Sequence, residues 1–178
     1  MSSVKNHTTA WEADAKGSEK NRVMGGTLYL VATPIGNLAD LSERAVKVLS
    51  EVDFIAAEDT RNTMHLLTYL GIQKPMVSYF EHNKRARGEE ILARISSGES
   101  CALVTDSGMP AVSDPGADLV ALCAERGISV SCVPGACAVV TALALSALPT
   151  GRFCFEGFLS TDKTSRKRHL ASLAQEQR

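Results

Sequence analysis

The sequence has few aromatic residues and no apolar run long enough to cross a membrane. Phe, Trp and Tyr make up only 5% of its 178 residues, and the longest apolar stretch covers residues 136–148. A transmembrane helix needs roughly 20 consecutive apolar residues, so we expect this stretch to form a buried helix. Residues 1–26 also lack the apolar segment of a secretory signal peptide. These absences predict a cytoplasmic protein without a membrane partner.

The sequence lacks the cysteine spacing of a disulfide framework or a zinc site. The number of cysteines is odd and no pair has C-x-x-C spacing. All but one of them lie among aliphatic or small residues, which predicts buried thiols in a reducing compartment and no bound metal. The five are Cys101, Cys123, Cys132, Cys137 and Cys154.

Charge of either sign is not in excess, because the chain carries a formal net charge of −1 at pH 7. Such a balance gives no overall attraction to nucleic acid. An RNA partner would therefore have to meet a local basic patch, or a patch on a second subunit.

Short apolar runs alternate with segments of helical periodicity from residue 27 onward. Five runs predict strands, and the segments between and after them predict helices. The alternation indicates the α/β class, with an open, mostly parallel five-stranded sheet flanked by helices. The expected strands are 28–32, 54–57, 76–79, 101–104 and 128–133, and the expected helices are 41–52, 64–70, 86–95, 114–126 and 135–148. Asp40 and Ser42 are the candidate N-caps of the first helix, and Asp114 is the predicted N-cap of the fourth.

The pattern divides the chain into three parts. Residues 1–26 are polar without apolar periodicity and are expected to be a disordered tail. Residues 27–149 form the α/β domain. Residues 150–178 hold a further predicted strand, 152–159, and a basic run, 163–168. This last part is too short to bury a core of its own, so we expect it to begin a second α/β domain that is cut short.

Two loops at the carboxyl ends of predicted strands have the composition of ligand-binding segments, and this is the edge where open parallel sheets bind ligands. Residues 33–37 contain Pro34 and Gly36, which favour a tight turn. Residues 105–116 are rich in glycine and hydroxyl groups and exceed the usual connection of about 4–6 residues. The dinucleotide-binding pattern G-x-G-x-x-G is absent, which argues against a nicotinamide enzyme.

Polar residues also follow the second and third predicted strands. In Glu58-Asp59-Thr60-Arg61, Asp59 or Thr60 could cap the next helix. Alternatively, the acid and Arg61 could face a cleft in which the guanidinium holds a phosphate. In Glu81-His82-Asn83, Asn83 is a candidate helix cap and His82 is either a proton carrier or a structural histidine.

Taken together, these segments resemble the tetrapyrrole-methylase superfamily and, within it, the enzymes that methylate small-subunit ribosomal RNA. The resemblance runs from residue 28 to about residue 159, and it rests on five motifs in the family's order. They are Leu-Val-Ala-Thr-Pro-Ile-Gly-Asn (30–37), Ala-Ala-Glu-Asp-Thr-Arg (56–61), Glu-His-Asn (81–83), Thr-Asp-Ser-Gly-Met-Pro with Ser-Asp-Pro-Gly (105–116) and Leu-Pro-Thr-Gly-Arg-Phe (148–153).

The resemblance implies a homodimeric enzyme that holds S-adenosyl-L-methionine (SAM) between two domains. It also implies 2′-O-methylation of a cytidine in the 16S RNA of the small ribosomal subunit. The chain departs from the family pattern at two places. It has Thr-Asp-Ser-Gly-Met-Pro (105–110) where the family usually has Ser-Asp-Ala-Gly-Thr-Pro, and Ala136-Cys137 where the family usually has Pro-Ser. The expected cofactor-binding residues are Pro34, Gly36, Asp106, Ser107, Gly108, Met109, Pro110, Ser113 and Gly135.

A ribose 2′-hydroxyl is a poor nucleophile, so a base that removes its proton during attack would help methyl transfer. Asp59 and His82 are the candidate catalytic residues, and Arg61 and Asn83 the candidate substrate-binding residues. Two alternatives stay open. The same fold could methylate another substrate, such as a tetrapyrrole, or the chain could be a non-catalytic RNA-binding or assembly module.

Overall fold

The structure is a computed structural model that describes residues 21–176. Strands and helices alternate along the α/β part, as the sequence predicts. In chain order the elements are β1 (Thr27–Val31), the 3-10 helix η2 (Leu38–Asp40), α2 (Glu43–Glu51), β2 (Phe54–Ala57), α3 (Thr60–Tyr69), β3 (Met76–Ser78), α4 (Lys84–Ser96), β4 (Cys101–Val104), α5 (Gly116–Glu125), β5 (Ser129–Val133), α6 (Ala138–Leu145) and α7 (Lys163–Leu173).

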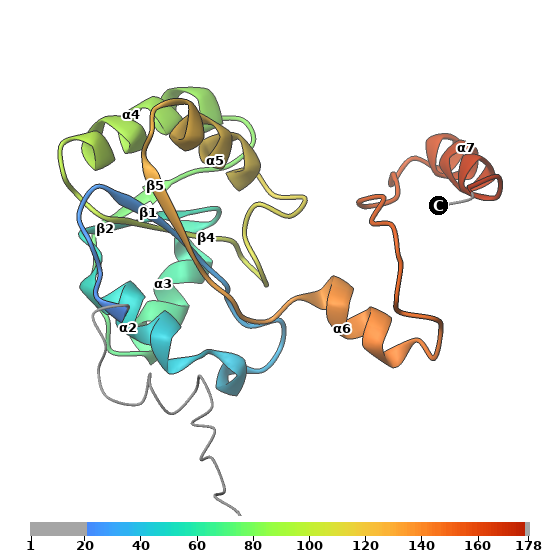
Figure 1. Cartoon of the computed structure of the whole chain (residues 1–178), viewed down its shortest axis with the longest axis horizontal. Helices are drawn as coiled ribbons and strands as arrows, with labels where there is room; N and C mark the ends of the chain where they lie inside the picture. Colours follow the sequence, from blue (N-terminus) through green and yellow to red (C-terminus); the bar gives the residue numbers. More distant parts are fainter. Residues whose placement is uncertain (1–20, 177–178) are drawn as a thin grey trace, which may run out of the picture.

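The five strands form one parallel sheet in the order β3-β2-β4-β1-β5. The predicted fold class is therefore confirmed. The chain moves outward from β1 to β2 and β3 with α2 and α3 on one face, then returns to β4 and β5 with α4 and α5 on the other face (Figure 1). This reversal keeps each crossover right-handed, which is the strongly preferred hand for parallel strands.

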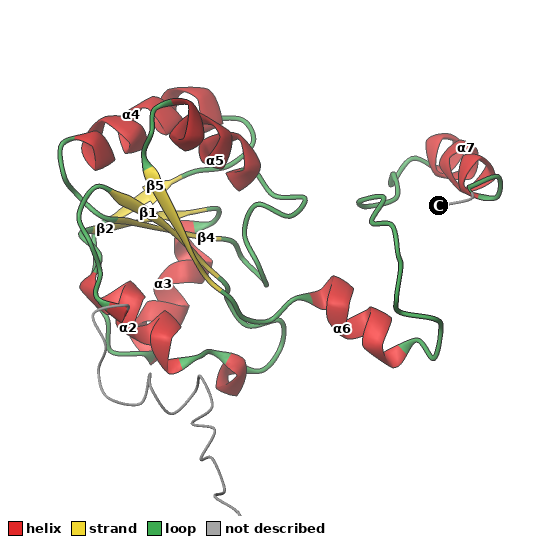
Figure 2. Cartoon of the chain, viewed as in Figure 1, coloured by secondary structure: helices red, strands yellow, loops and turns green. Residues whose placement is uncertain are grey.

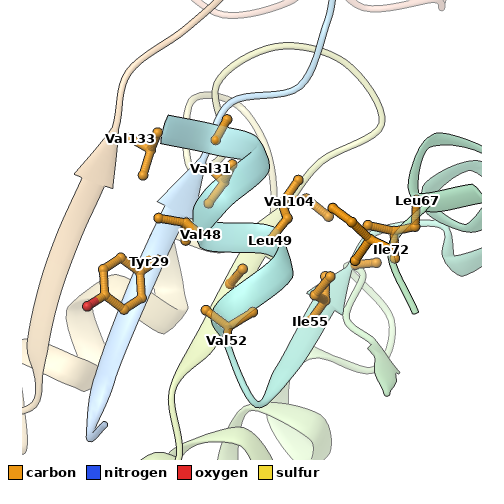
Figure 3. Close-up of a cluster of buried hydrophobic side chains, with 13 residues drawn as sticks. Tyr29, Val31, Val48, Leu49, Val52, Ile55, Leu67, Ile72, Val104 and Val133 are labelled. Atoms are coloured by element: carbon orange, nitrogen blue, oxygen red, sulfur yellow. The ribbon is translucent and has the colours of Figure 1, made fainter. Parts of the chain in front are cut away.

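Each face of the sheet packs against two helices, which explains why the strands are continuous apolar runs. One core lies under α2 and α3 and includes Val31, Leu49 and Ile55 (Figure 3). The other lies under α4 and α5 and includes Phe54 and Ile91. Phe54 and Ile55 are neighbours in β2 and enter opposite cores, because side chains alternate across a strand.

Helix starts agree with the predicted caps at two positions and differ at a third. The hydroxyl of Ser42 accepts from the N–H of Ala45, and the carboxylate of Asp59 accepts from the N–H of Arg61. The predicted cap at Asp114 is wrong. Helix α5 begins one residue later, with Pro115 at the cap position and no side-chain cap bond. Asp114 instead lines a small cavity below the 105–113 loop.

The predicted burial of residues 136–148 and of four cysteines is wrong in part. Helix α6 has no buried residue and extends away from the sheet (Figure 1). Cys132 is exposed and Cys137 only half-buried, because β5 is an edge strand that neither α6 nor α7 covers. Cys101 and Cys123 are buried as expected.

The segments just before and after the expected α/β domain have the following structure. The N–H of Gly26 donates to the carbonyls of Gly98 and Glu99, so order begins before residue 27; residues 1–20 of the expected tail lie outside the described residues. The predicted strand 152–159 is not formed, because the segment has no strand beside it with which to pair (Figure 2). Between residues 21 and 176, no helix combines the length and apolarity that a membrane crossing requires.

Candidate functional site

A pocket opens at the carboxyl ends of β1 and β4. These neighbouring strands lead to helices on opposite faces of the sheet, so the loops after them diverge and leave a crevice. Its volume of about 370 Å³ falls in the range of small-molecule sites, roughly 300–1,000 Å³. The lining residues are Thr33, Pro34, Gly36, Asn37, Leu38, Asn62, Thr63, His65, Leu66, Tyr69, Thr105 and Asp106.

A pair of backbone hydrogen bonds, which we call the loop clasp, joins the two loops beside this pocket. The N–H of Thr33 donates to the carbonyl of Gly108 over 2.9 Å, and the N–H of Gly108 donates to the carbonyl of Thr33 over 3.1 Å. The buried hydroxyl of Thr33 also donates to the carbonyl of Thr105 over 3.0 Å. The clasp therefore fixes the 33–37 loop against the 105–113 loop and sets the pocket's shape.

The backbone of the 105–113 loop adopts conformations that side chains disfavour. Gly108 has a φ of +87°, and a Cβ atom there would lie 3.3 Å from Cγ2 of Ile35 and 3.5 Å from the carbonyl oxygen of Ala136. Ala111 and Ser113 also have positive φ, at 67° and 60°. Such strain is costly and clusters at functional sites, which supports a binding role for this loop.

The chain after β5 closes against the same edge. A Cβ atom on Gly135 would lie 2.8 Å from Cβ of Ala32, so only glycine allows this close approach. Helix α6 begins at Ala138 rather than near Gly135 as predicted, and its cap residue Cys137 makes no side-chain cap bond. Gly135 thus contributes backbone packing at the site edge, and the helix N-terminus lies further along the chain.

Three carboxylates gather around Thr105 behind the pocket. The Thr105 hydroxyl donates to Oε2 of Glu58 over 2.6 Å, and Nδ2 of Asn62 donates to Oδ2 of Asp106 over 3.0 Å. Asp114 lines the same small cavity as Glu58 and Thr105. Burial raises the pKa of Asp114, and the negative charge of Glu58 raises it further. Of the three, only Asp106 lines the pocket, while Glu58 and Asp114 line the small cavity behind it.

Replacing Asp114 with asparagine is expected to raise the melting temperature at pH 7. A folded-state pKa above the unfolded value means that the ionised carboxylate destabilises the fold. This destabilisation is absent below the unfolded pKa, about 3.9, grows as pH rises from the unfolded to the folded pKa, and is constant above the folded pKa. The stabilising effect should therefore disappear near pH 3, which thermal melting across pH can follow.

Asp118→Asn is the matched control for this change, because Asp118 lies nearby in the first turn of α5 but pairs with Nζ of Lys84 at 2.6 Å. It should lower the melting temperature at pH 7 or leave it unchanged. A lower melting temperature for Asp114→Asn at pH 7 would show that its carboxylate stabilises the loop instead.

Asp59 and Arg61 form a two-point ion pair outside the pocket lining. Nε of Arg61 lies 3.1 Å from Oδ1 of Asp59, and Nη2 lies 2.7 Å from Oδ2. The hydrogen bonds from Arg61 lower the pKa of Asp59 to about 2. The Arg61 side chain is nevertheless 86% exposed. Asp59 thus caps α3 and pairs with Arg61, while much of the guanidinium still faces solvent.

His82 and Asn83 lie at the end of β3, which is separated from β4 by β2. His82 is exposed, and its ring packs edge-on against Phe80 with 6.2 Å between ring centroids. Asn83 occupies the cap position of α4 without capping it; its amide bonds to the N–H of Phe80 and the carbonyl of Ser78. Neither residue lines the pocket between β1 and β4.

The structure brings some of the predicted site residues together and leaves others apart. Pro34, Gly36 and Asp106 line the pocket, and Gly108 forms the loop clasp beside it. The remaining predicted cofactor residues lie in the same loops or at the same edge without lining the pocket, and the predicted catalytic and substrate residues lie outside it. The remaining ones are Ser107, Met109, Pro110, Ser113 and Gly135.

One face of α3 forms a pocket wall that the sequence analysis missed. It presents Asn62, His65 and Tyr69, which follow each other at spacings of three and four residues. This helical period, directly after the Glu-Asp-Thr-Arg motif, is the signal that could have identified them. Within residues 21–176, no three His, Cys, Asp or Glu side chains form a group that could hold a metal ion.

Comparison with known proteins assigns this chain to a family. The family model described as Tetrapyrrole (Corrin/Porphyrin) Methylases matches residues 27–178. The chain belongs to the tetrapyrrole methylase family. The family resemblance seen in the sequence is thereby confirmed.

Among the relatives of this methylase-family chain are proteins named ribosomal RNA small subunit methyltransferase I. The Synechocystis protein is 54% identical over 153 residues, which cover 86% of this chain and 55% of the relative. The Escherichia coli O157:H7 protein is 47% identical, covering 86% and 54%. The Thermotoga maritima protein is 50% identical, covering 86% and 68%. This methylase-family chain spans about half the length of most of the curated relatives it matches.

Solved structures share the fold of this methylase-family chain at lower identity. Uroporphyrin-III-C-methyltransferase from Thermus thermophilus has a TM-score of 0.54 at 24% identity, covering 70% of this chain and 53% of that one. A conserved hypothetical protein from Aeropyrum pernix K1 has a TM-score of 0.59 at 22% identity, covering 72% and 45%. These likenesses concern the α/β architecture alone.

Proposed function

We propose that this methylase-family chain binds SAM and takes part in 2′-O-methylation of a cytidine ribose in 16S ribosomal RNA. The relatives' shared name supports the substrate, since it refers to the RNA of the small ribosomal subunit. The proposal places the protein in the cytoplasm, where it meets small subunits, and includes assembly as a homodimer. The observation that carries it is the pocket between β1 and β4 beside the loop clasp.

The residues around this pocket fit a nucleoside-containing cation such as SAM. The volume of about 370 Å³ and the mixed wall of Leu38, Leu66, Tyr69 and Asn62 suit a ligand with both polar and apolar parts. The carboxylate of Asp106 lies in the wall, and complementary charge of this kind favours a positively charged sulfonium. Pro34, Gly36 and Gly108 would let the backbone of the two loops approach the ligand closely. Of the other proposed cofactor residues, Ser107, Met109, Pro110 and Ser113 extend the loop and Gly135 the facing edge.

SAM, when bound, supplies a methyl group already activated for displacement. The chain's own residues must then orient the ribose hydroxyl, because correct alignment alone can contribute several kcal/mol. We assign Arg61, whose guanidinium is largely exposed, to an RNA phosphate, and Asn83 to shaping the 81–83 loop toward the RNA. Asp59 and His82 are the proposed residues for removing the hydroxyl proton.

Two measurements on the chain test this proposal separately. Titration calorimetry with SAM should show binding at one site per chain. Transfer of a labelled methyl group to unmodified small ribosomal subunits should place the label on a cytidine ribose. No heat of SAM binding would contradict the donor site. RNA binding without SAM binding would instead identify a binding or assembly module, and label transfer to a tetrapyrrole would identify a different substrate.

The two proposed proton acceptors are expected to differ in importance. His82→Ala should lower kcat by roughly tenfold or more while the Kd for SAM stays constant, because His82 lies outside the pocket wall. Asp59→Asn should have a smaller effect on kcat, since a carboxylate with a pKa of about 2 is a weak base at neutral pH. Single-turnover methyl transfer across pH would measure both.

His65→Ala is the contrasting histidine variant, because His65 lines the pocket. It should raise the Kd for SAM and leave the rate at saturating SAM largely unchanged. Equal single-turnover rates for His82→Ala and the unaltered chain at every pH would remove His82 from the proposed mechanism.

A further inference from the structure

Helix α7 concentrates positive charge in a chain that is otherwise acidic. It carries Lys163, Arg166, Lys167 and Arg168 and contains no Asp or Glu. All four cationic side chains belong to exposed residues. Since the whole chain has a formal net charge of −1, the residues outside these four carry a net charge of −5. The positive field around α7 is therefore a local feature of the molecule.

The cations of α7 lack the acidic partners that neutralise other cationic helices. In α4, Lys84 pairs with Glu81 and Asp118, and Arg87 pairs with Glu90. No such ion pair involves the four cations of α7 among residues 21–176; the Arg166 guanidinium meets only two backbone carbonyls, at 3.5 Å. Their charges are thus available to an anionic partner.

Helix α7 does not depend on these cations for its own start. The carboxylate of Asp162 accepts from the N–H of Ser165 over 2.6 Å and caps the helix. Lys163, Arg166 and Lys167 have the spacing that places side chains on one side of a helix. Helix α7 also extends away from the sheet (Figure 1), so this side is accessible. Its large apolar residues are Leu170 and Leu173 alone, which do not make the broad apolar face of a membrane-surface helix.

We infer that α7 is a docking element for the phosphate backbone of RNA, separate from the donor pocket. The inference rests on the proposed function, which requires that a chain whose other residues carry a net charge of −5 approach a polyanion. Phosphate contacts by Lys and Arg position a protein on nucleic acid without reading its sequence. A cationic helix outside the pocket would hold the RNA while the ribose enters the site. Mobile Lys and Arg side chains suit this role, because it needs charge more than fixed geometry.

The test compares Lys163→Gln/Lys167→Gln, which removes two cations from this side of α7, with the control Lys47→Gln/Arg87→Gln. Each double variant removes two positive charges, and glutamine preserves helix propensity. Lys47 and Arg87 are paired with Glu51 and Glu90, so their charges are already neutralised. Binding of each chain to a 16S ribosomal RNA fragment is measured between 50 and 200 mM salt, with SAM affinity and thermal melting recorded in parallel.

Loss of two phosphate contacts should lower the salt slope of RNA binding by about 1.4–1.8. The affinity advantage of the unaltered chain over the α7 variant should then shrink about tenfold between 50 and 200 mM salt. SAM affinity and melting temperature should be unaltered, and the control should keep the original slope.

Equal slopes for all three chains, or equal losses in both double variants, would overturn the assignment of α7. If the unaltered chain binds neither RNA nor SAM, the proposed function fails along with this inference. If it binds SAM and RNA but the α7 variant keeps the full slope, only the inference fails. If it binds RNA through α7 but not SAM, α7 remains an RNA-docking element and the methyl-donor proposal is the one that fails.

Discussion

Replacing Gly108 with valine is expected to abolish SAM binding, with the Kd rising at least about 100-fold, which corresponds to about 2.7 kcal/mol. Gly108 has a φ of +87°, which a β-branched residue strongly disfavours. The new side chain would also meet Cγ2 of Ile35 and the carbonyl of Ala136, because Cβ alone approaches them to 3.3 and 3.5 Å. The backbone must move, and the loop clasp to Thr33 is broken with it.

Gly127→Val is the matched control for this prediction. Gly127 also has a positive φ, +65°, but a Cβ atom there meets nothing within 4 Å, and it lies after α5, outside the pocket lining. Both variants should lose stability from backbone strain of about 1–2 kcal/mol, so thermal melting should fall in each. Titration calorimetry should show lost SAM binding only for Gly108→Val. An unchanged Kd in that variant would remove the 105–113 loop from the proposed donor site.

The sheet was predictable because its central strands β2 and β4 are buried on both faces. Runs such as Phe54–Ala57 are apolar at every position, and the helices between them have a helical period, so element type follows from local pattern. The strand order was not predicted. It depends on pairings between residues distant in sequence, such as Leu28 with Cys101 and with Val130. Right-handed crossovers restrict these pairings without selecting one.

Burial was less predictable, because it depends on which neighbour covers an element. The α6 segment is as apolar as the buried strands, yet none of its residues is buried, since it leaves the sheet instead of packing on it. Composition alone cannot distinguish these cases. The same limit applies to Cys132, which lies in an apolar run but on the edge strand β5.

The candidate site was predictable where it consists of backbone loops. Pro34, Gly36 and the 105–113 loop were singled out by their turn chemistry, and they meet at one edge because parallel strands end together. The gathering of Glu58 and Asp114 around Thr105 was not predicted. These residues lie 47 and 9 positions from Thr105 in the sequence, and only tertiary packing brings them together. Local patterns therefore located the site, including Asp106 in its wall, and tertiary contacts determined which carboxylates gather behind it.

Replacing Phe54 with alanine should lower the free energy of unfolding by about 3–5 kcal/mol, which is the usual loss when a large aromatic is removed from a core. Phe54 is fully buried in the core under α4 and α5. The Arg94 guanidinium lies 3.5 Å from the centre of its ring, so the substitution also removes a cation–π contact. Since domains are typically stable by only about 5–15 kcal/mol, a substantial unfolded population is expected.

Two variants separate the causes of this loss, with urea unfolding as the measurement. Phe158→Ala is the matched control: its side chain is 82% exposed and should change stability little. Phe54→Leu fills much of the space but has no aromatic ring. Its loss in free energy of unfolding should be smaller than that of Phe54→Ala, and it combines the lost cation–π contact, about 0.5–2 kcal/mol, with a smaller cavity. Equal unfolding midpoints for Phe54→Ala and Phe158→Ala would contradict the core packing described here. A similar dependence of unfolding free energy on urea concentration in all variants would show that the comparison concerns the same two-state transition.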